Sequence, residues 1–418
     1  MSPAKRIIDF LGLRRSMVGL LAMVVLVGLG EKMAERFLPI YILALGGGAI
    51  IVGLLNGLDN LLSALYSLPG GYLSDRLGVK RALLLFNLMA MAGFVIVILI
   101  PTWPAVIAGA VLFLSWTAIS LPASMGLVSQ AVPTAKRTMG VSMHSLVRRI
   151  PMALGPVVGG LFIDHWGARD GVRLAFAAAL LMAGLAIILQ QLLIQDDRAD
   201  RAAAAGKAAP RHPLKLLREL SPALRNLLVS DILIRFCEQI PYAFVVIWCL
   251  KEISAPVSAT QFGILTAIEM ATAALVYVPV AYFADRLGKK PFVLATFVFF
   301  ALFPLALLFC RSFWPLVAAF VLRGLKEFGD ATRKALIMDL APEDRKALTF
   351  GVYYLARDSI VALAAFGGGL LWAYCSPATN FLTAFAFGVL GTVWFALRGR
   401  DLTAGTQATD RAVRSSRS

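Results

Sequence analysis

The chain has 418 residues, of which 59% are hydrophobic and 15% are charged. With a mean hydropathy of +0.79, it is too apolar to be a set of soluble domains, in which about 25% of the residues are charged. The formal net charge of +16 leaves open either a nucleic-acid partner or a membrane protein that keeps its basic residues on one side.

Apolar segments long enough to cross a membrane recur along the whole chain. A hydrocarbon core of about 30 Å takes about 20 helical residues, and this criterion predicts twelve helices. They cover approximately residues 17–43, 49–72, 82–101, 104–128, 140–163, 173–194, 226–250, 258–282, 291–310, 313–336, 349–372 and 379–397. The first one lacks a small-residue cleavage site and is too long for a secretory signal, so we interpret it as a retained helix.

Basic residues outside the predicted helices are concentrated on one side of the membrane. Most of them lie in the termini and in the connections on the same side as the N-terminus, and the other side holds Arg169, Arg173, Lys251 and Arg311. This is the positive-inside pattern. We therefore expect a multi-pass protein of the cell (inner) membrane, with the lipid bilayer as its surroundings, both termini cytoplasmic and no nucleic-acid partner.

The cysteines show no spacing that indicates chemistry. Cys237, Cys249, Cys310 and Cys375 form no CxxC or Cys/His pattern and lie in or beside apolar helices. Buried cysteine behaves as a small hydrophobe. We expect packed thiols, with no metal and no cofactor.

Two stretches of the chain repeat each other. YLSDRLGVK at residues 72–80 returns as YFADRLGKK at residues 282–290. At the same offset of 210 residues Asp59 matches Glu269, and further on the GGL of residues 159–161 matches that of residues 368–370 at an offset of 209. The repeat predicts a six-helix bundle in residues 1–195 and a second in residues 226–400. Between them lies a cytoplasmic linker (196–225) whose end has the character of an amphipathic surface helix, and a disordered cytoplasmic tail follows (401–418).

The repeated stretch resembles the signature G-x-L-x-D-R-x-G-x-K of the major facilitator superfamily. The matching residues are Gly71, Leu73, Asp75, Arg76, Gly78 and Lys80, with Asp285, Arg286 and Gly288 at equivalent places in the second half. The resemblance covers nearly the whole chain. It implies an all-α membrane protein with 12 transmembrane helices in two pseudo-symmetric six-helix bundles around a central cavity.

The same resemblance implies a role for the repeated loops as a cytoplasmic gate. An aspartate at the negative C-terminal end of a helix is better placed at the positive N-terminus of another helix. In the family the partners are the starts of the eleventh helix, for Asp75, and of the fifth helix, for Asp285. The alternative is an ordinary basic cytoplasmic loop.

Charged residues inside the predicted helices are distributed unevenly. The third, sixth, ninth and twelfth helices contain none within their spans apart from Arg173 at one margin, and intramembrane charges usually face a wet cavity or a partner. The candidates for the substrate cavity are Arg148, Arg149, Arg235, Glu238, Arg323, Lys326, Glu327, Asp330, Arg357 and Asp358. In a continuous tenth helix Arg323, Glu327 and Asp330 share one face, whereas Arg333 and Lys334 are expected to be interfacial. A salt-bridge ladder that only holds helices together is the alternative.

Four acids are candidates for proton coupling: Glu31, Glu35, Asp59 and Glu269. Glu31 and Glu35 lie one helical turn apart, where burial and a like charge favour protonation. Lys32 and Arg36 beside them suggest a plain ion-pair cluster instead. Asp59 and Glu269 are more isolated, and their alternative is a hydrogen-bonded structural role. We expect His144, at the start of the fifth helix, to be a surface residue.

The fifth predicted helix carries a small-residue motif. Gly155, Pro156, Gly159 and Gly160 resemble the core of the family's antiporter motif, G-x-x-x-G-P-x-x-G-G, although Pro151 replaces its leading glycine. Small residues at this spacing let two helices approach closely, and ordinary helix packing is the alternative. The arginine that many family exporters carry in the fourth helix is absent from the residues around 114–116. A proton relay borrowed from those exporters is therefore not expected.

These observations predict a secondary active transporter that moves a small organic solute by alternating access. Proton-coupled antiport with export is favoured by the partial antiporter motif, and we expect a monomer. Importing or proton-symporting an anionic metabolite is the alternative that the arginines suggest. A non-transporting membrane receptor on the same scaffold is a further alternative. No ATPase motif or phosphate-binding glycine loop occurs in the sequence, so no enzyme activity is expected.

Overall fold

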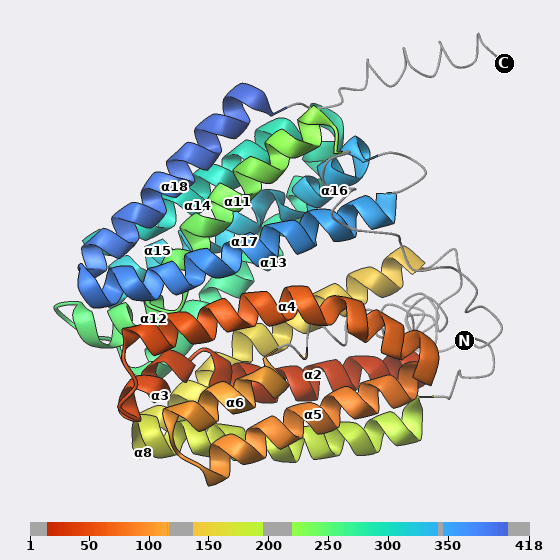
Figure 1. The fold of residues 1–418 in the computed structure, drawn as a ribbon, viewed down its shortest axis with the longest axis vertical. Helices are drawn as coiled ribbons and strands as arrows, with labels where there is room; N and C mark the ends of the chain where they lie inside the picture. Colours follow the sequence, from red (N-terminus) through yellow and green to blue (C-terminus); the bar gives the residue numbers. More distant parts are fainter. Residues whose placement is uncertain (1–14, 115, 117–136, 195–219, 342–345, 400–418) are drawn as a thin grey trace, which may run out of the picture.

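The computed structural model describes residues 15–114, 116, 137–194, 220–341 and 346–399, and this part of the chain contains helices but no strand. The helices of the first half are α2 (Arg15–Glu35), α3 (Leu38–Ala44), α4 (Ala49–Leu77), α5 (Val79–Leu99), α6 (Trp103–Phe113) and α8 (Arg137–Leu193). Those of the second half are α11 (Pro222–Tyr242), α12 (Val245–Ile247), η2 (Trp248–Glu252), α13 (Ala259–Leu287), α14 (Lys290–Phe309), α15 (Phe313–Leu325), η3 (Lys326–Gly329), α16 (Asp330–Leu340), α17 (Lys346–Tyr374) and α18 (Pro377–Arg398). Figure 1 shows the two groups as two layers, with α2–α8 in the lower one and α11–α18 in the upper one.

Each of the twelve predicted segments coincides at least in part with described helical residues. Among these residues six helices are long and apolar enough to cross a membrane, or seven if the bent pair Pro222–Tyr242 and Val245–Glu252 is one span. The number differs from twelve because α8 holds the fifth and sixth predicted helices, separated by Gly167 at a φ of 77°, and because others are broken. Residues 117–128 of the fourth predicted helix, the linker up to residue 219 and the tail lie outside the described part.

The first and seventh predicted helices break at equivalent places. α2 ends at Glu35 and α3 begins two residues after it ends, while α11 and α12 are separated by a turn of the same length. A proline lies near each break: Pro39 in the first turn of α3 and Pro241 in the last turn of α11. Because proline removes a backbone donor, it favours such breaks. In Figure 1, α3 and α12 lie near each other at one end of the molecule, which we call the α3–α12 end.

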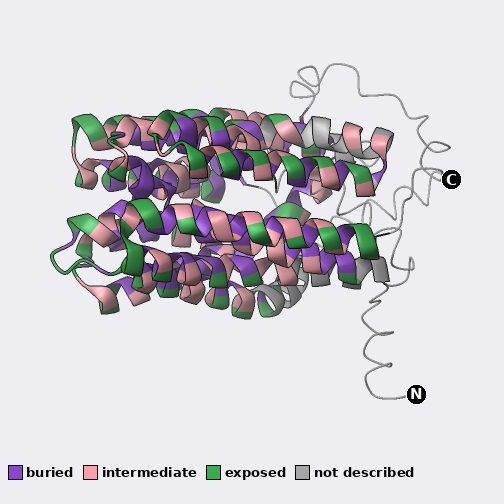
Figure 2. Cartoon of the chain, turned by 90° about the horizontal axis from the view of Figure 1, so that it is seen from below, coloured by how far each residue is buried: buried purple, intermediate pink, exposed green. Residues whose placement is uncertain are grey.

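The surface of the helices is apolar in the way a lipid-facing surface requires. Leu99 in α5, Leu181 in α8, Phe309 in α14 and Leu397 in α18 are more than 70% exposed. These belong to the third, sixth, ninth and twelfth predicted helices, which lack charges. In Figure 2 the helices change from buried to exposed residues around their circumference. The uncharged helices thus form part of the outside of the bundle.

Repeated glycines make equivalent contacts inside the two halves. A Cβ atom on Gly159 in α8 would lie 2.0 Å from the Met33 carbonyl oxygen in α2. A Cβ atom on Gly368 in α17 would lie 2.1 Å from the Ile240 carbonyl oxygen in α11. Any larger side chain would push these helices apart. The sequence repeat therefore corresponds to a repeated close packing of backbones.

The turns that follow α4 and α13 are also repeated. Gly78 and Gly288 have φ angles of 81° and 93°, a region that glycine adopts without steric cost. Each turn joins a long helix directly to the next one. Glycine at these two positions is thus a requirement of the backbone.

Candidate functional site

A pocket lies between the two halves, beside the breaks in the first and seventh predicted helices. Its lining comes from α2, α3, α4 and α6 on one side and from α11, α12, α13 and α15 on the other. The lining residues are Glu35, Arg36, Leu38, Pro39, Val52, Leu55, Asn56, Asp59, Leu114, Tyr242, Ala243, Val245, Val246, Phe262 and Arg323. A mostly apolar concave site with a few charged groups is typical of small-molecule binding.

The pocket lies near the middle of the membrane. Asp59 is ten residues from the start of α4, and Arg323 is ten residues from the start of α15. Both helices begin at the α3–α12 end. At a rise of about 1.5 Å per residue, both side chains start roughly 15 Å below that end, halfway through a core of about 30 Å.

Tyr242 joins the two halves at this pocket. The Arg36 guanidinium of the first half lies 5.2 Å from the centre of the Tyr242 ring, and the Arg323 guanidinium lies 5.7 Å from it. Both distances suit cation–π attraction. The ring therefore holds two arginines, one from each half, in the wall of the pocket.

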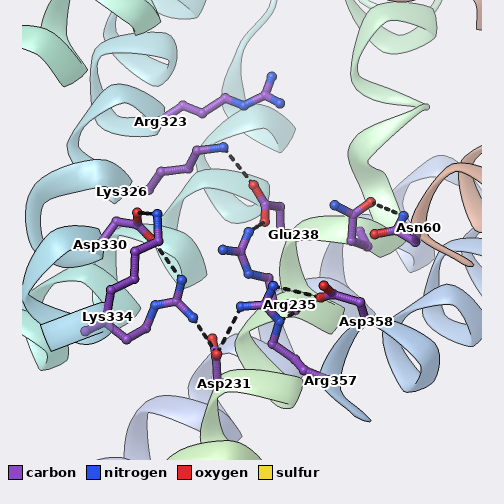
Figure 3. A network of polar contacts seen from close by, with 12 residues as sticks. Asn60, Asp231, Arg235, Glu238, Arg323, Lys326, Asp330, Lys334, Arg357 and Asp358 are labelled. Atoms are coloured by element: carbon purple, nitrogen blue, oxygen red, sulfur yellow. Dashed lines mark hydrogen bonds and ion pairs between the residues drawn. The ribbon is translucent and has the colours of Figure 1, made fainter. Parts of the chain in front are cut away.

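The acids of the second half that lie closest to the pocket are held by basic residues, and Figure 3 shows one of them, Glu238, bound by Lys326. Glu269 lies 3.2 Å from Arg323 Nε and 3.5 Å from Lys326 Nζ, and it is fully buried. Lys326 Nζ also donates a hydrogen bond of 2.8 Å to Glu238, which Arg235 binds at 2.5 Å. These two carboxylates and three basic side chains form one network of ion pairs that keeps one excess positive charge.

A second group of charges lies deeper in the second half, around Asp231. Arg333 and Arg357 both bind Asp231, the latter at 3.3 Å, and the Tyr353 hydroxyl donates to it at 3.2 Å. Arg333 also binds Asp330 at 2.7 Å. Arg333 is only 2% exposed, so the expectation that it is interfacial was wrong. Sequence reasoning did not single out Asp231, which is the centre of this group.

The charges of the tenth predicted helix do not share one face. The 3₁₀ turn η3 lies between α15 and α16 and has fewer residues per turn than an α-helix. Arg323 points to Glu269 in α13, Glu327 lies 3.5 Å from Arg149 in α8, and Asp330 pairs with residues of its own helix. The expectation of a single charged face assumed a continuous α-helix, and the structure corrects it.

The first half has its own charged cluster, on α2. Lys32 binds Glu35 and lies 3.4 Å from Glu31. Glu31 lines a small second pocket together with Lys32, Arg148 and Trp116. One Glu31 oxygen is buried without a hydrogen-bond partner within the described residues. Glu31 is therefore only partly neutralised.

Asp59 and Arg36 differ from the charges around them. Neither has an ion-pair partner among the residues that the structure describes, and Asp59 accepts no hydrogen bond there either. The charged side chains that act on Asp59 belong to α2 and the turn after it: Glu35, Lys32, Glu31 and Arg36. The pocket thus contains one carboxylate and one guanidinium without a direct ion-pair partner in the described part of the chain.

The halves also contact each other through amides next to the pocket. Asn56 donates to the Gln239 carbonyl oxygen and Asn60 to the Gln239 side-chain oxygen, both at 3.1 Å. These hydrogen bonds connect α4 with α11. They fix α4, and with it Asp59, against the second half.

The α3–α12 end is closed by contact between α8 and the start of α13. Asp164 accepts hydrogen bonds from the backbone N–H groups of Ala259 at 2.8 Å and of Thr260 at 2.9 Å. A Cβ atom on Gly160 would lie 2.4 Å from the Ala259 carbonyl oxygen. The carboxylate supplies acceptors to the unpaired donors at a helix N-terminus. Sequence reasoning missed Asp164, whose signal was an acid at the end of one predicted helix and a Ser-x-x-Gln capping pattern before another.

The proposed cytoplasmic gate is described only in part. The side chains of Asp75, Arg76, Asp285 and Arg286 lie outside the described part, as does that of His144. The contacts of both aspartates with other helices therefore stay a prediction.

The repeated lysines of the two loops make equivalent hydrogen bonds. Lys80 donates to the Gln191 carbonyl oxygen near the end of α8 at 2.9 Å, and Lys290 donates to the Ala396 carbonyl oxygen near the end of α18 at 3.0 Å. Cations are favourable at helix C-termini. These lysines therefore bind helix ends.

Two pseudo-symmetric helical halves with a pocket between them are the architecture of a class of secondary membrane transporters. The sequence model of the Major Facilitator Superfamily matches residues 20–253 and 227–416. The chain therefore belongs to the Major Facilitator Superfamily. This membership makes it a multi-pass membrane transporter and not an enzyme.

Relatives and solved structures agree with this membership. The chain is 22% identical over 370 residues to an uncharacterized MFS-type transporter of Methanocaldococcus jannaschii, covering 85% of this chain and 87% of that protein. It is 30% identical over 148 residues to a tetracenomycin C resistance and export protein of Streptomyces glaucescens, covering 34% of this chain and 26% of that protein. A nucleoside transporter has a similar fold, with a TM-score of 0.76 at 13% identity over 92% of this chain and 100% of the other. A POT family transporter solved with a thioalcohol conjugated peptide has a TM-score of 0.75 at 12% identity, covering 92% of this chain and 95% of the other.

Proposed function

We propose that the protein exports a small organic solute in exchange for protons, by alternating access across the cell (inner) membrane. The observation that carries this proposal is Asp59, a carboxylate in the midplane pocket without an ion-pair partner in the described part of the chain. Such a carboxylate can hold either a proton or a cationic group of the solute. The proton and the solute compete for this carboxylate. If the proton binds from the outside and the solute binds from the cytoplasm, the movement of one drives the movement of the other.

The other three candidate acids are less suited to this role. Lys32 contacts Glu31 and Glu35, and Arg323 and Lys326 contact Glu269. A carboxylate next to a cation stays ionised more readily than one without it. Asp59 is therefore the acid that we assign to proton exchange.

The orientation follows from the distribution of basic residues. With both termini in the cytoplasm, the α3–α12 end faces the outside, and the contact of Asp164 with α13 closes that side. The described arrangement then belongs to the part of the cycle in which the outer side is shut. The similarity of about a third of the chain to an export protein favours export, and we propose a monomer as the working unit.

An importer of an anionic metabolite is less favoured. The basic residues that suggested it, among them Arg235, Lys326 and Arg357, are bound by carboxylates of the second half. A substrate anion would have to displace those acids. No observation favours a non-transporting receptor.

Transport by the purified protein in proteoliposomes tests the proposal. With an imposed pH gradient, and with ethidium and phenylalanine as probes, we expect accumulation of at least one probe that stops when the gradient is collapsed. Asp59→Asn should reduce gradient-driven accumulation at least 10-fold at every probe concentration, whereas exchange of labelled for unlabelled probe should return when the probe concentration is raised to offset the weaker binding. Asp170→Asn, at an acid that is 64% exposed, is the matched control and should behave as the unchanged protein. Full gradient-driven accumulation by Asp59→Asn would overturn the assignment.

A further inference from the structure

The charges that line the central pocket fall into two classes. Glu35 is bound by Lys32, and Arg323 lies against Glu269. Asp59 and Arg36 have no ion-pair partner among the described side chains, although they line the same pocket. After the protein's own pairs are formed, the pocket thus retains one negative and one positive group.

Unpaired charges in a low-dielectric site favour a ligand that neutralises both of them. An ionised group away from water is costly unless it is paired and hydrogen-bonded. A ligand with a cation alone would pair with Asp59 and leave Arg36 without a direct ion-pair partner, and a ligand with an anion alone would do the reverse. A molecule with both charges satisfies both groups at once.

Arg36 is held in place for such a ligand. Its guanidinium lies 5.2 Å from the Tyr242 ring centre, and Arg323 lies near the same ring. Guanidinium groups bind carboxylates and phosphates through paired N–H donors. Because the ring holds Arg36 on the side of the second half, while Asp59 belongs to α4, a bound molecule has to bridge from one to the other.

The rest of the pocket indicates an apolar body between or beside the two charges. Its uncharged lining includes Val52 and Leu55 of the first half and Val246 and Phe262 of the second half. Phe262 also packs edge-on against Phe37, with ring centres 5.9 Å apart. Burial of an apolar body against these side chains supplies affinity that does not depend on charge.

We propose that the solute is a zwitterion with an apolar body, whose cationic group binds Asp59 and whose carboxylate or phosphate binds Arg36. This proposal rests on the proposed transport function and specifies its substrate class. Recognition by charge is then a property of the first half. The second half contributes Tyr242 and an apolar wall.

Equilibrium binding with probes that differ only in charge tests the substrate class. Two sets share one body each: phenylalanine, phenylalanine methyl ester and N-acetylphenylalanine, and 6-aminohexanoic acid with its methyl ester and N-acetyl derivative. Calorimetry with the full chain in lipid nanodiscs gives the dissociation constants without any pH gradient. We expect at least one zwitterion to bind at least 10-fold more tightly than both its cationic and its anionic derivative. The two sets also distinguish a short from a long separation of the charges.

Variants at the two unpaired groups assign each charge. Asp59→Asn should raise the dissociation constant of the zwitterion at least 10-fold and leave that of the N-acetyl derivative unchanged. Arg36→Gln should also raise the dissociation constant of the zwitterion, but it should leave that of the ester unchanged. Arg36→Lys keeps the positive charge and should retain part of the affinity, which separates recognition from misfolding.

Several outcomes would overturn the proposal that the solute is a zwitterion. Equal affinity for the ester would indicate a cationic solute, equal affinity for the N-acetyl derivative would indicate an anionic one, and failure of both zwitterions to bind would also reject it. Because these measurements need no gradient, a zwitterion that binds but drives no proton exchange would reject proton coupling alone.

Discussion

The two halves of this transporter share their backbone packing but differ in how they treat charge. In the second half the acids Asp231, Glu238 and Glu269 each contact at least one Lys or Arg within the described residues. In the first half Asp59 forms no ion pair with a Lys or Arg of the described part of the chain. The two halves thus keep glycines at equivalent positions but use charged residues differently. The acids of the second half form ion pairs that hold helices together, a group we call the paired scaffold, whereas Asp59 of the first half stays available in the pocket.

The largest effect is expected from breaking the paired scaffold at Asp231. Asp231→Asn leaves Arg333 and Arg357 without their shared counter-charge in a buried place. Removing one partner of a buried pair typically costs about 3–5 kcal/mol. We expect a loss of this size in the free energy of unfolding, measured by denaturant titration in mixed micelles.

A matched change at the surface should do almost nothing. Asp170 lies 3.4 Å from Arg173 and is 64% exposed, and exposed pairs contribute about 0–1 kcal/mol. Asp170→Asn is therefore the control. Comparable losses for both variants would mean that the Asp231 group is not a stabilising network.

The shared backbone packing predicts equal effects in the two halves. A Cβ atom on Gly159 or Gly368 would overlap a carbonyl oxygen of the neighbouring helix, and overpacking typically costs about 1–3 kcal/mol. Gly159→Ala and Gly368→Ala should each lower the free energy of unfolding by that amount. Gly184 in α8 and Gly367 in α17 have nothing within 4 Å of the position of a Cβ atom.

These open glycines provide a control within the same helices. Gly184→Ala and Gly367→Ala should leave stability unchanged or raise it by up to about 1 kcal/mol, because alanine favours helix. Loss of stability in only one member of the pair Gly159→Ala and Gly368→Ala would show that the halves are not equivalent in packing.

Much of this architecture could be predicted from the sequence. Long apolar segments have few structural options in lipid, so their lengths predicted the helices. The repeat predicted two equivalent halves, and the GGL stretches at residues 159–161 and 368–370 indicated close packing. These features depend on residues that are neighbours in the chain or on one helix face.

The choice of charge partners could not be predicted in the same way. Glu269 and Arg323 are far apart in the sequence, and their contact depends on how α13 and α15 pack. The 3₁₀ turn η3 also changed the direction of Glu327 relative to Arg323. Composition therefore identified the charged helices, but only the packing shows that, among the charges that line the central pocket, Asp59 and Arg36 have no ion-pair partner in the described residues.

The smallest effect concerns a contact that only one half possesses. Asp164 accepts from the first N–H groups of α13, in addition to the N-cap residue Ser258 of that helix, whereas α4 begins after Gly48 and has no side-chain cap. Loss of a side-chain acceptor at a helix N-terminus costs about 1 kcal/mol. Asp164→Ala should therefore weaken closure of the α3–α12 end by a factor of about five.

Spin labels across that end measure the shift. Arg169 and Ser254 are exposed at the α3–α12 end and can carry labels as R169C and S254C, on a background in which the exposed Cys375 is replaced by Ser. Asp164→Ala should increase the long-distance population, and Asp170→Ala should leave it unchanged. Asp75→Asn with Asp285→Asn should move the same population in the opposite direction, because the predicted gate closes the other end. If both sets of changes move the population the same way, the two contacts do not act on opposite sides of one alternating equilibrium.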